Sequence, residues 1–298
     1  RPVSRFFDRI ARPEQILDSL PRALATLTDP ANCGPVTLGF CQDVQAEAFD
    51  YPQSFFERRV WRPRAPRPDR ADIDAMAALL KKAKAPLIVA GGGVLYSNAE
   101  RELAAFAAAH DIPVAETQAG KGALAWDHAQ ALGSIGVTGS SAANEAAAHA
   151  DVVIGLGTRL QDFTSGSRTL FERPDCALVQ VNVAPHDAHK HNALPVIADA
   201  KQALLVLDAA LKEWRAPQAW TDRTTKAARA WQKVVDGATA APSEPGLPSD
   251  AHVIGAVQRA ADENAIVVCA AGGLPGELHK LWRTAKPGGY HLEYGYSC

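Results

Sequence analysis

The sequence is poor in cysteine, and none of its apolar runs is long. The five cysteines among the 298 residues are scattered, odd in number and without a CxxC pair, which argues against a disulfide framework and favours reduced intracellular thiols. No run approaches the roughly 20 consecutive apolar residues of a membrane-spanning helix, and the N-terminus carries no apolar secretory core. We therefore expect a cytoplasmic protein without a membrane partner.

An excess of charge of either sign is also missing. The 31 Lys and Arg residues nearly balance the 33 Asp and Glu residues, for a net charge of −2. That balance gives no electrostatic reason to expect a nucleic-acid partner. The hydrophobic content of 47% supports a sizeable core, and the length suits one large domain or two ordinary ones.

Compact catalytic motifs are absent as well. The sequence contains no G-x-S-x-G elbow, no H-E-x-x-H and no G-D-G. Its single methionine is Met76, and it stops at Tyr296-Ser297-Cys298, within what reads as a structured loop. We expect both ends to be cut inside folded domains.

An alternation of apolar strands with helices is present from residue 70 onward. We expect strands over 86–90, 112–115, 151–155, 177–183 and 195–198, and helices over 70–83, 98–109, 142–149 and 200–213. Continuous apolar strands between helices predict a doubly wound parallel α/β sheet, Rossmann-like and covered on both faces. Because the strands end in glycine or polar residues, the functional edge should lie at their carboxyl ends.

The regions on either side carry partial α/β patterns. A helix over 13–28 and a strand over 36–40 precede a segment rich in proline and arginine, and a second linker runs from Gly237 to Pro248. After it, Asp250 is placed to cap a helix that ends near Ala261. The strand over 265–269 then begins a βα unit, for which we expect no further sheet.

Two glycine-rich turns are candidate phosphate sites. Gly91-Gly92-Gly93 follows a strand, but Tyr96 stands where a dinucleotide fingerprint has its third glycine. Asp111 lies near the spacing of a ribose-binding acid, and the alternative is a tight strand-to-helix turn. In the turn over 155–159, Arg159 either clamps a phosphate or carboxylate or pairs with Asp162 at the surface. These residues alone do not decide between the alternatives.

A histidine cluster and a third glycine turn leave similar alternatives. His186, His189 and His191 follow a strand, where they form either a metal site or the caps of an ordinary turn. The turn Gly272-Gly273-Leu274-Pro275-Gly276 ends a buried strand and begins a helix. Its free backbone N–H groups suit a diphosphate, although a plain βα turn fits these residues equally well.

A longer set of residues resembles a known family. The set comprises the run Pro113-Val114-Ala115-Glu116-Thr117-Gln118-Ala119-Gly120-Lys121-Gly122, then His128, Leu132-Gly133, Gly136, Gly139 through Asn144, and Ala150 through Arg159. It resembles the central domain of the acetolactate-synthase group of thiamine-diphosphate-dependent enzymes. Gly34–Leu38 and Gln42–Val44 resemble the end of that group's pyrimidine-binding domain, although Cys41 replaces the usual proline.

The resemblance implies a division of the chain into five parts. Residues 1–52 would be the tail of the pyrimidine-binding domain, 53–69 a linker, 70–214 the central Rossmann-like domain, 215–249 a second linker, and 250–298 the truncated first part of the diphosphate-binding domain. Stretches over 43–52, 184–191, 272–282 and 291–298 resemble one branch of the group more than the rest. That branch opens a cyclic 1,2-diketone with water, giving 5-deoxy-glucuronate in myo-inositol catabolism.

The same resemblance implies thiamine diphosphate and Mg²⁺ as cofactors of the whole enzyme, a small-molecule substrate, and a homo-oligomer whose active site forms between two subunits. The activating glutamate and the G-D-G…N metal motif would lie outside these 298 residues, so we expect no catalytic or metal-binding residue here and an inactive isolated chain. The residues implied to contact the cofactor are Gly272, Gly273 and Leu274 at the diphosphate and Gly295, Ser297 and Cys298 at the aminopyrimidine.

Two further expectations follow from the resemblance. Relatives that carry FAD usually have acidic residues where this chain has Asn182 and Ala184, so FAD is not expected, and the histidine cluster in the same loop becomes structural. Two alternatives to the hydrolase stay open: a synthase or decarboxylase of 2-oxo acids, and a non-catalytic nucleotide-binding or oligomerisation module resting on Gly91–Gly93.

Overall fold

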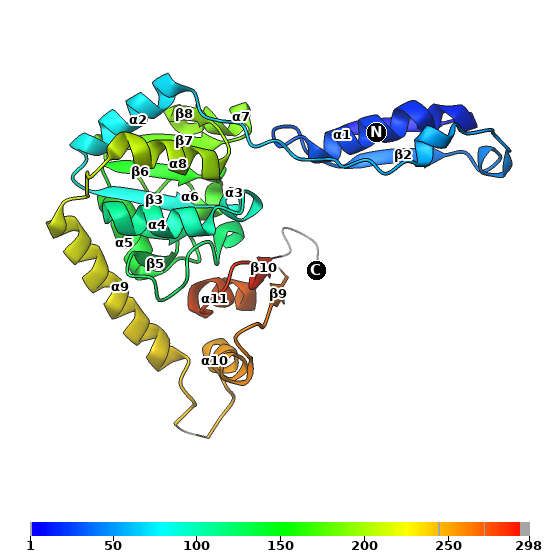
Figure 1. Cartoon of the computed structure of the whole chain (residues 1–298). Helices are drawn as coiled ribbons and strands as arrows, with labels where there is room; N and C mark the ends of the chain where they lie inside the picture. Colours follow the sequence, from blue (N-terminus) through cyan, green and yellow to red (C-terminus); the bar gives the residue numbers. More distant parts are fainter. Residues whose placement is uncertain (1, 244, 271, 293–298) are drawn as a thin grey trace. The chain divides into compact units, whose positions relative to one another are not determined.

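A computed structural model describes residues 2–243, 245–270 and 272–292 of the chain (Figure 1). The chain divides into two units, one up to residue 65 and one from residue 66 onward. The boundary falls within the segment 53–69 that was expected to be a linker. No helix in the described ranges is long and apolar enough to cross a bilayer.

The first unit is a βαβ element. Strands β1 (Phe6–Ile10) and β2 (Val36–Phe40) pair in parallel, and α1 (Ile16–Thr28) connects them after a 3₁₀ turn over Pro13–Gln15. Strand β1 was not predicted, because the charged Asp8 and Arg9 separate Phe7 from Ile10 and interrupt the apolar run. The prediction of α1 and β2 is confirmed.

The second unit contains a six-stranded parallel sheet in the order β5-β4-β3-β6-β7-β8. Its strands are β3 (Pro86–Ala90), β4 (Val114–Glu116), β5 (Ala131–Ser134), β6 (Val152–Leu156), β7 (Ala177–Asn182) and β8 (Leu194–Ile197). Every residue of the central strands β3 and β6 is buried, as expected for a sheet covered on both faces. The predicted α/β sheet is confirmed, whereas β5 was not predicted.

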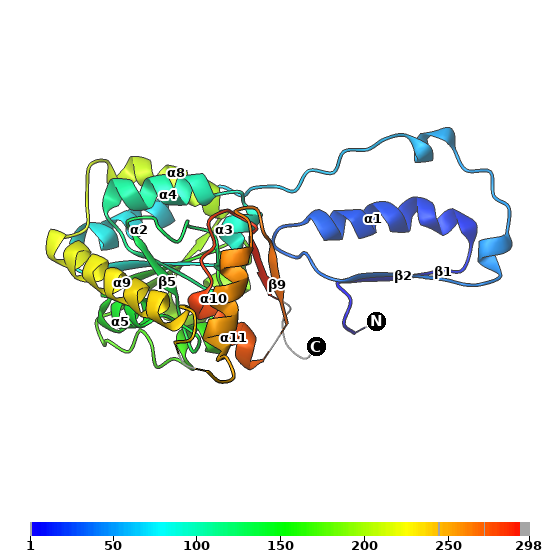
Figure 2. The same ribbon diagram turned by 90° about the horizontal axis from the view of Figure 1, so that it is seen from below.

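Helices cover both faces of this sheet. They are α2 (Arg70–Lys82), α3 (Gly92–Tyr96), α4 (Glu100–His110), α5 (Ser141–His149), α6 (Asp162–Ser165), α7 (Pro185–Ala188), α8 (Ala200–Leu211) and α9 (Gln218–Ala238). Figure 2 shows α2, α4 and α8 on one side of the sheet and α5 and α9 on the other. Side chains of Asp69, Ser140 and Asp199 accept backbone N–H bonds at the starts of α2, α5 and α8.

Helix α9 occupies much of the segment 215–249, which was expected to be a linker. It packs against α5, and the indole of the buried Trp220 donates to the carbonyl of Pro86 at 2.8 Å. The buried positions Trp220, Thr224 and Val235 follow helical spacing, a pattern that the polar and charged residues between them obscure. The domain bounds proposed from the sequence stay predictions.

The end of the second unit is a small βαβ element that contacts the sheet. It consists of α10 (Asp250–Ala260), β9 (Val267–Cys269), α11 (Gly273–Leu281) and β10 (Tyr290–Leu292). Strand β10 pairs with β9 in parallel, so the expectation that no strand completes this unit was wrong. Ser249, not Asp250, caps α10, because Asp250 is already helical and the Ser249 hydroxyl accepts from the His252 amide.

Backbone crowding at the carboxyl edge of the sheet predicts a sharp response to one added methyl group. A Cβ on Gly120 would lie 2.1 Å from the Ala90 carbonyl oxygen, whereas a Cβ on Gly237 in α9 would meet nothing within 4 Å. We expect Gly120→Ala to lower the free energy of unfolding by about 1–3 kcal/mol or more. The matched Gly237→Ala should leave it unchanged or raise it by up to about 1 kcal/mol. Urea denaturation of both variants tests this, and equal effects would contradict it.

Candidate functional site

The point where the strand order reverses, between β3 and β6, is where an open α/β sheet usually binds ligands. Here the two glycine turns pack directly on each other. The Gly93 amide donates to the Gly157 carbonyl at 2.9 Å, and a Cβ on Gly91 or Gly93 would come within 2.4–2.6 Å of Gly157. Helix α3, which follows, is only five residues long. The glycines therefore serve close backbone packing, which supports the tight-turn interpretation over nucleotide binding.

The acid and the arginine proposed around these turns lie elsewhere. Asp111 ends α4 in the left-handed conformation, at the amino end of β4, and pairs with Arg215 at 2.7 Å. It therefore lies at the opposite end of the sheet from a ligand bound at Gly91–Gly93. Arg159 is exposed and forms no ion pair with Asp162 or any other residue in the described part of the chain.

The histidine cluster has ordinary local partners. His189 Nδ1 lies 2.8 Å from the Pro185 carbonyl, and His191 Nε2 lies 3.1 Å from the Leu160 carbonyl. Across the described ranges, no three His, Cys, Asp or Glu side chains converge as metal ligands do. Nearby, Asn182 donates to the Thr158 carbonyl and accepts from the Ala184 amide. These contacts support the structural interpretation of the cluster.

The turn between β9 and α11 has the features of an anion site. Gly272 has φ +133° and ψ −166°, which is open to glycine and strained for other residues. A Cβ on Gly273 would meet nothing within 4 Å, and Leu274 is 40% exposed. The amides of Gly273 and Leu274 begin α11, so no residue within the helix accepts from them. Open space at a helix start, with amides that have no acceptor among the described residues, is an arrangement that can bind anions.

The other three implied cofactor contacts cannot be placed in the same way. Gly295, Ser297 and Cys298 lie outside the described residues. The four described cysteines, in contrast, are all free thiols, and no disulfide constrains the fold around the turn.

A buried polar cluster joins the sheet to the βαβ element beside this turn. At the end of β4, the Glu116 carboxylate accepts from the amides of Gly122 (3.1 Å) and Leu124 (2.9 Å). Burial raises the pKa of this carboxyl group, and the neighbouring Lys121 ammonium opposes the rise. The two backbone donors thus hold a buried carboxylate and, with it, the loop that follows β4.

Lys121 and His279 are the basic members of the cluster. Burial lowers the pKa of Lys121 to about 8, an effect that Glu116 partly offsets, and its Nζ lies 5.7 Å from the centre of the Tyr290 ring. His279 of α11 is 1% exposed, and its Nδ1 lies 2.8 Å from the Thr138 hydroxyl. Burial, reinforced by Lys121, lowers the pKa of His279 to about 3, so the ring is neutral near pH 7.

The residues that carry the family resemblance include Glu116, Lys121 and His279, without an assigned role, whereas Thr138 is not among them. A charged residue at the end of the buried strand 112–115 was the available signal for Glu116. Thr138 and His279 lie 141 residues apart in the chain, so their contact follows only from the tertiary structure.

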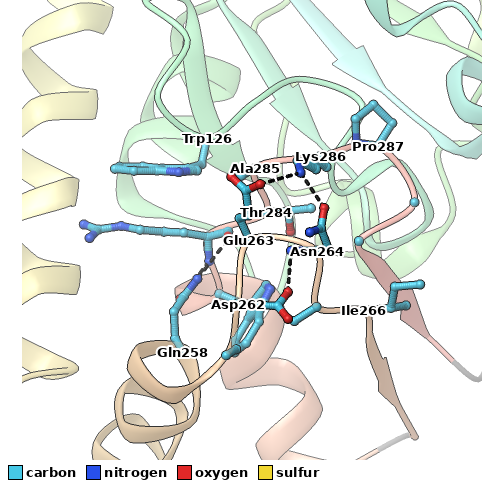
Figure 3. A pocket seen from close by; sticks show the side chains of 16 residues that line it. Trp126, Gln258, Asp262, Glu263, Asn264, Ile266, Thr284, Ala285, Lys286 and Pro287 are labelled. Atoms are coloured by element: carbon cyan, nitrogen blue, oxygen red, sulfur yellow. Dashed lines mark hydrogen bonds and ion pairs between the residues drawn. The ribbon is translucent and has the colours of Figure 1, made fainter.

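A pocket of about 330 Å³ lies at the other end of the βαβ element, before the starts of β9 and β10 (Figure 3). Its charged side chains already have partners. The Arg283 guanidinium stacks 4.5 Å from the centre of the Trp126 ring and pairs with Asp236 at 2.6 Å. Lys286 Nζ lies 2.5 Å from Asn264 Oδ1. The pocket thus lies apart from the Gly272–Leu274 turn and offers a diphosphate no free cation among its described residues.

Comparison with known proteins bears on the same regions. Residues 73–207 match the family model described as thiamine pyrophosphate enzyme, central domain. The whole chain is 41% identical over 321 aligned residues to the 3D-(3,5/4)-trihydroxycyclohexane-1,2-dione hydrolase of Bacillus thuringiensis (strain Al Hakam), covering 50% of that protein. It is 39% identical over 322 residues to the protein of the same name from Shouchella clausii (strain KSM-K16), again covering 50%. The chain therefore spans about half the length of these curated relatives.

The low pKa of His279 predicts a pH dependence of stability. Between its folded-state pKa of about 3 and its ordinary value of 6.5, the unfolded chain binds a proton that the folded chain does not. The free energy of unfolding should therefore fall as the pH falls from 6.5 toward 3. His279→Asn cannot take up that proton, so we expect it to lose less stability between pH 7 and pH 4 than the wild type.

Denaturant midpoints at the two pH values measure this difference. His149→Asn, at an exposed histidine of α5, is the control and should show the wild-type loss. An undiminished acid loss in His279→Asn would show that other groups account for it.

Proposed function

We propose that the chain, whose residues 73–207 match the central domain of thiamine pyrophosphate enzymes, is part of a hydrolase that opens a cyclic 1,2-diketone. The proposed substrate is trihydroxycyclohexane-1,2-dione. The proposed product is 5-deoxy-glucuronate, formed by addition of water and cleavage of a ring carbon–carbon bond in myo-inositol catabolism. The active enzyme would be a cytoplasmic homo-oligomer.

The observation that carries this proposal is the extent of the likeness. It is not confined to the central domain, which many enzymes share, but runs through residues 1–72 and 208–298 to cover all of the chain. Fold alone does not identify a reaction, since one scaffold serves many chemistries. An identity of 41% over an alignment that spans the turn at Gly272–Leu274 favours the same reaction over that of a 2-oxo-acid synthase or decarboxylase.

The chain's own contribution to the site would be to hold one end of the cofactor. The amides of Gly273 and Leu274 would donate to diphosphate oxygens, and the positive end of α11 would favour the same charge. When bound, thiamine diphosphate supplies a nucleophilic carbon that attacks a carbonyl group. As the family resemblance implies, the ligands of Mg²⁺ would come from the remainder of the protein.

The proposed reaction can be assayed in the protein extended to the length of its relatives. We expect ring opening of the dione to depend on added thiamine diphosphate and Mg²⁺. The loss of the diketone absorbance measures the reaction. Formation of acetolactate from pyruvate by the same preparation is the competing outcome. Synthase activity without ring opening would replace the hydrolase assignment, and ring opening without thiamine diphosphate would remove the cofactor from it.

The role of the turn can be separated from its backbone strain with a matched pair of glycines. Gly272 (φ +133°) and Gly288 (φ +73°) both adopt conformations that disfavour alanine, and neither is crowded. Each Gly→Ala change should cost about 1–2 kcal/mol of stability. We expect only Gly272→Ala to raise the thiamine diphosphate concentration needed for half-maximal activity, by about tenfold. Equal increases in the two variants would indicate a general loss of stability instead.

A further inference from the structure

We infer that the contact between Thr138 and His279 positions the turn Gly272–Leu274 over the carboxyl edge of the central sheet. The two side chains would act as positioning residues for the cofactor, without touching it. This inference rests on the proposed function, because the turn is taken to bind the diphosphate. It assigns a role to the loops that follow β4 and β5, for which no ligand is proposed.

The turn itself has few packing constraints. Gly272, Gly273 and Leu274 are all exposed, and β9 pairs with β10 over only three residues. Helix α11, in contrast, is a continuous nine-residue helix that begins at the turn. His279 lies six residues along it from Gly273, about 9 Å at the usual helical rise. Whatever fixes α11 near its middle and end therefore fixes the donors at its start.

The central domain holds α11 at three points, all from the segment in and after β5. The Thr138 hydroxyl lies 2.8 Å from His279 Nδ1, and the Ser134 hydroxyl donates to the His279 carbonyl. A Cβ on Gly276 would lie 3.0 Å from the Thr138 methyl group, so helix and loop are in close contact there. His279 is 1% exposed, and its bond to Thr138 is shielded from competing water.

The loop that carries Thr138 is itself rigid. The Asn144 side chain donates to the Gly136 carbonyl and accepts from the Gly136 amide, both at 2.9 Å. Next to it, the Val137 amide donates to the Phe163 carbonyl at 2.8 Å. These bonds tie the loop to the starts of α5 and α6. A contact made by Thr138 thus transmits the position of the sheet to α11.

The loop after β4 supports the same arrangement from a second side. Gln118 accepts from the Tyr290 hydroxyl at 3.0 Å and donates to the Thr138 hydroxyl at 3.4 Å. Lys121, held in place through the Glu116 loop, lies over the Tyr290 ring. The two loops are therefore connected through Thr138, and together they set the positions of both α11 and β10.

The test compares Thr138→Val, which keeps the shape and removes the hydroxyl, with Thr138→Ser, which keeps the hydroxyl. In the protein extended to the length of its relatives, we expect Thr138→Val to raise the thiamine diphosphate concentration for half-maximal activity about five- to tenfold. The kcat at saturating cofactor should stay within about twofold of the wild type. Thr138→Ser should match the wild type in both quantities.

A second pair of variants examines the other partner, with a measurement that needs no cofactor. His279→Asn places a polar atom near the position of Nδ1, whereas His279→Gln places it near Nε2. Hydrogen exchange of the α11 amides, measured without cofactor, should accelerate in Thr138→Val and His279→Gln. It should stay near the wild-type rate in Thr138→Ser and His279→Asn, with the α8 amides unchanged in all four as an internal control.

Three outcomes would overturn the inference. They are an unchanged cofactor requirement and unchanged exchange in Thr138→Val, an equal defect in Thr138→Ser, and a fall in kcat at saturating cofactor without any change in cofactor requirement. The failure of the proposed function looks different. If the wild-type protein opens the dione without thiamine diphosphate, the proposed function is contradicted. The exchange measurement still decides whether the contact between Thr138 and His279 holds α11 in place.

Discussion

The packing of the second unit depends on how its buried carboxylate, that of Glu116, is hydrogen-bonded. Glu116 ends β4 in a buried position, where an unmatched negative charge would be costly. The amides of Gly122 and Leu124 satisfy it, and they can do so only if the chain turns back on itself directly after the strand. This turn carries Gln118 and Lys121 to the side of the sheet where the βαβ element packs. A single internal interaction thus shapes the loop and prepares the surface that receives the C-terminal elements.

Between β3 and β6, where the strand order reverses, glycine residues allow two backbone segments to pack in direct contact. Gly91 and Gly93 pack on Gly157, and Gly120 packs on the carbonyl of Ala90. The amide of Gly93 is used in this contact rather than left for a ligand. A glycine pattern that resembles part of a nucleotide fingerprint is therefore explained here by packing. The start of α11, an element outside the central sheet, instead offers backbone donors that the helix itself does not use.

This arrangement gives the central domain a function although it holds no catalytic residue in the proposed scheme. Its carboxyl edge presents a rigid loop after β5 and a charged loop after β4, and both contact elements that begin more than 100 residues later in the chain. The domain therefore acts on the proposed cofactor turn by fixing its position. Because binding groups must be held close to their working geometry, such support has consequences for affinity even at some distance from the chemistry.

The sequence by itself determined the type of fold. Continuous apolar strands alternating with helices can be buried only as a parallel sheet covered on both faces, so β3, β4, β6, β7 and β8 and the helices α2, α4, α5 and α8 follow from periodicity alone. The family likeness, too, could be recognised from residues 113–122 and 150–159 without a structure. Shorter or more polar elements were missed, namely β1, β5, β10, α3, α6, α7 and α9, because their formation depends on partners that are distant in the chain rather than on a local pattern.

Only the tertiary structure decided what the candidate residues do. The glycines at 91–93, Asp111 and the histidines at 186–191 carried functional alternatives in the sequence, and their contacts support structural roles. Glu116, Lys121 and His279 drew attention only as parts of the family motifs, and Thr138 did not, yet these four residues form the buried contact beside the turn Gly272–Leu274. The reason is physical: the chemistry of a side chain is set by the dielectric, donors and charges around it, and these come from segments that only folding brings together.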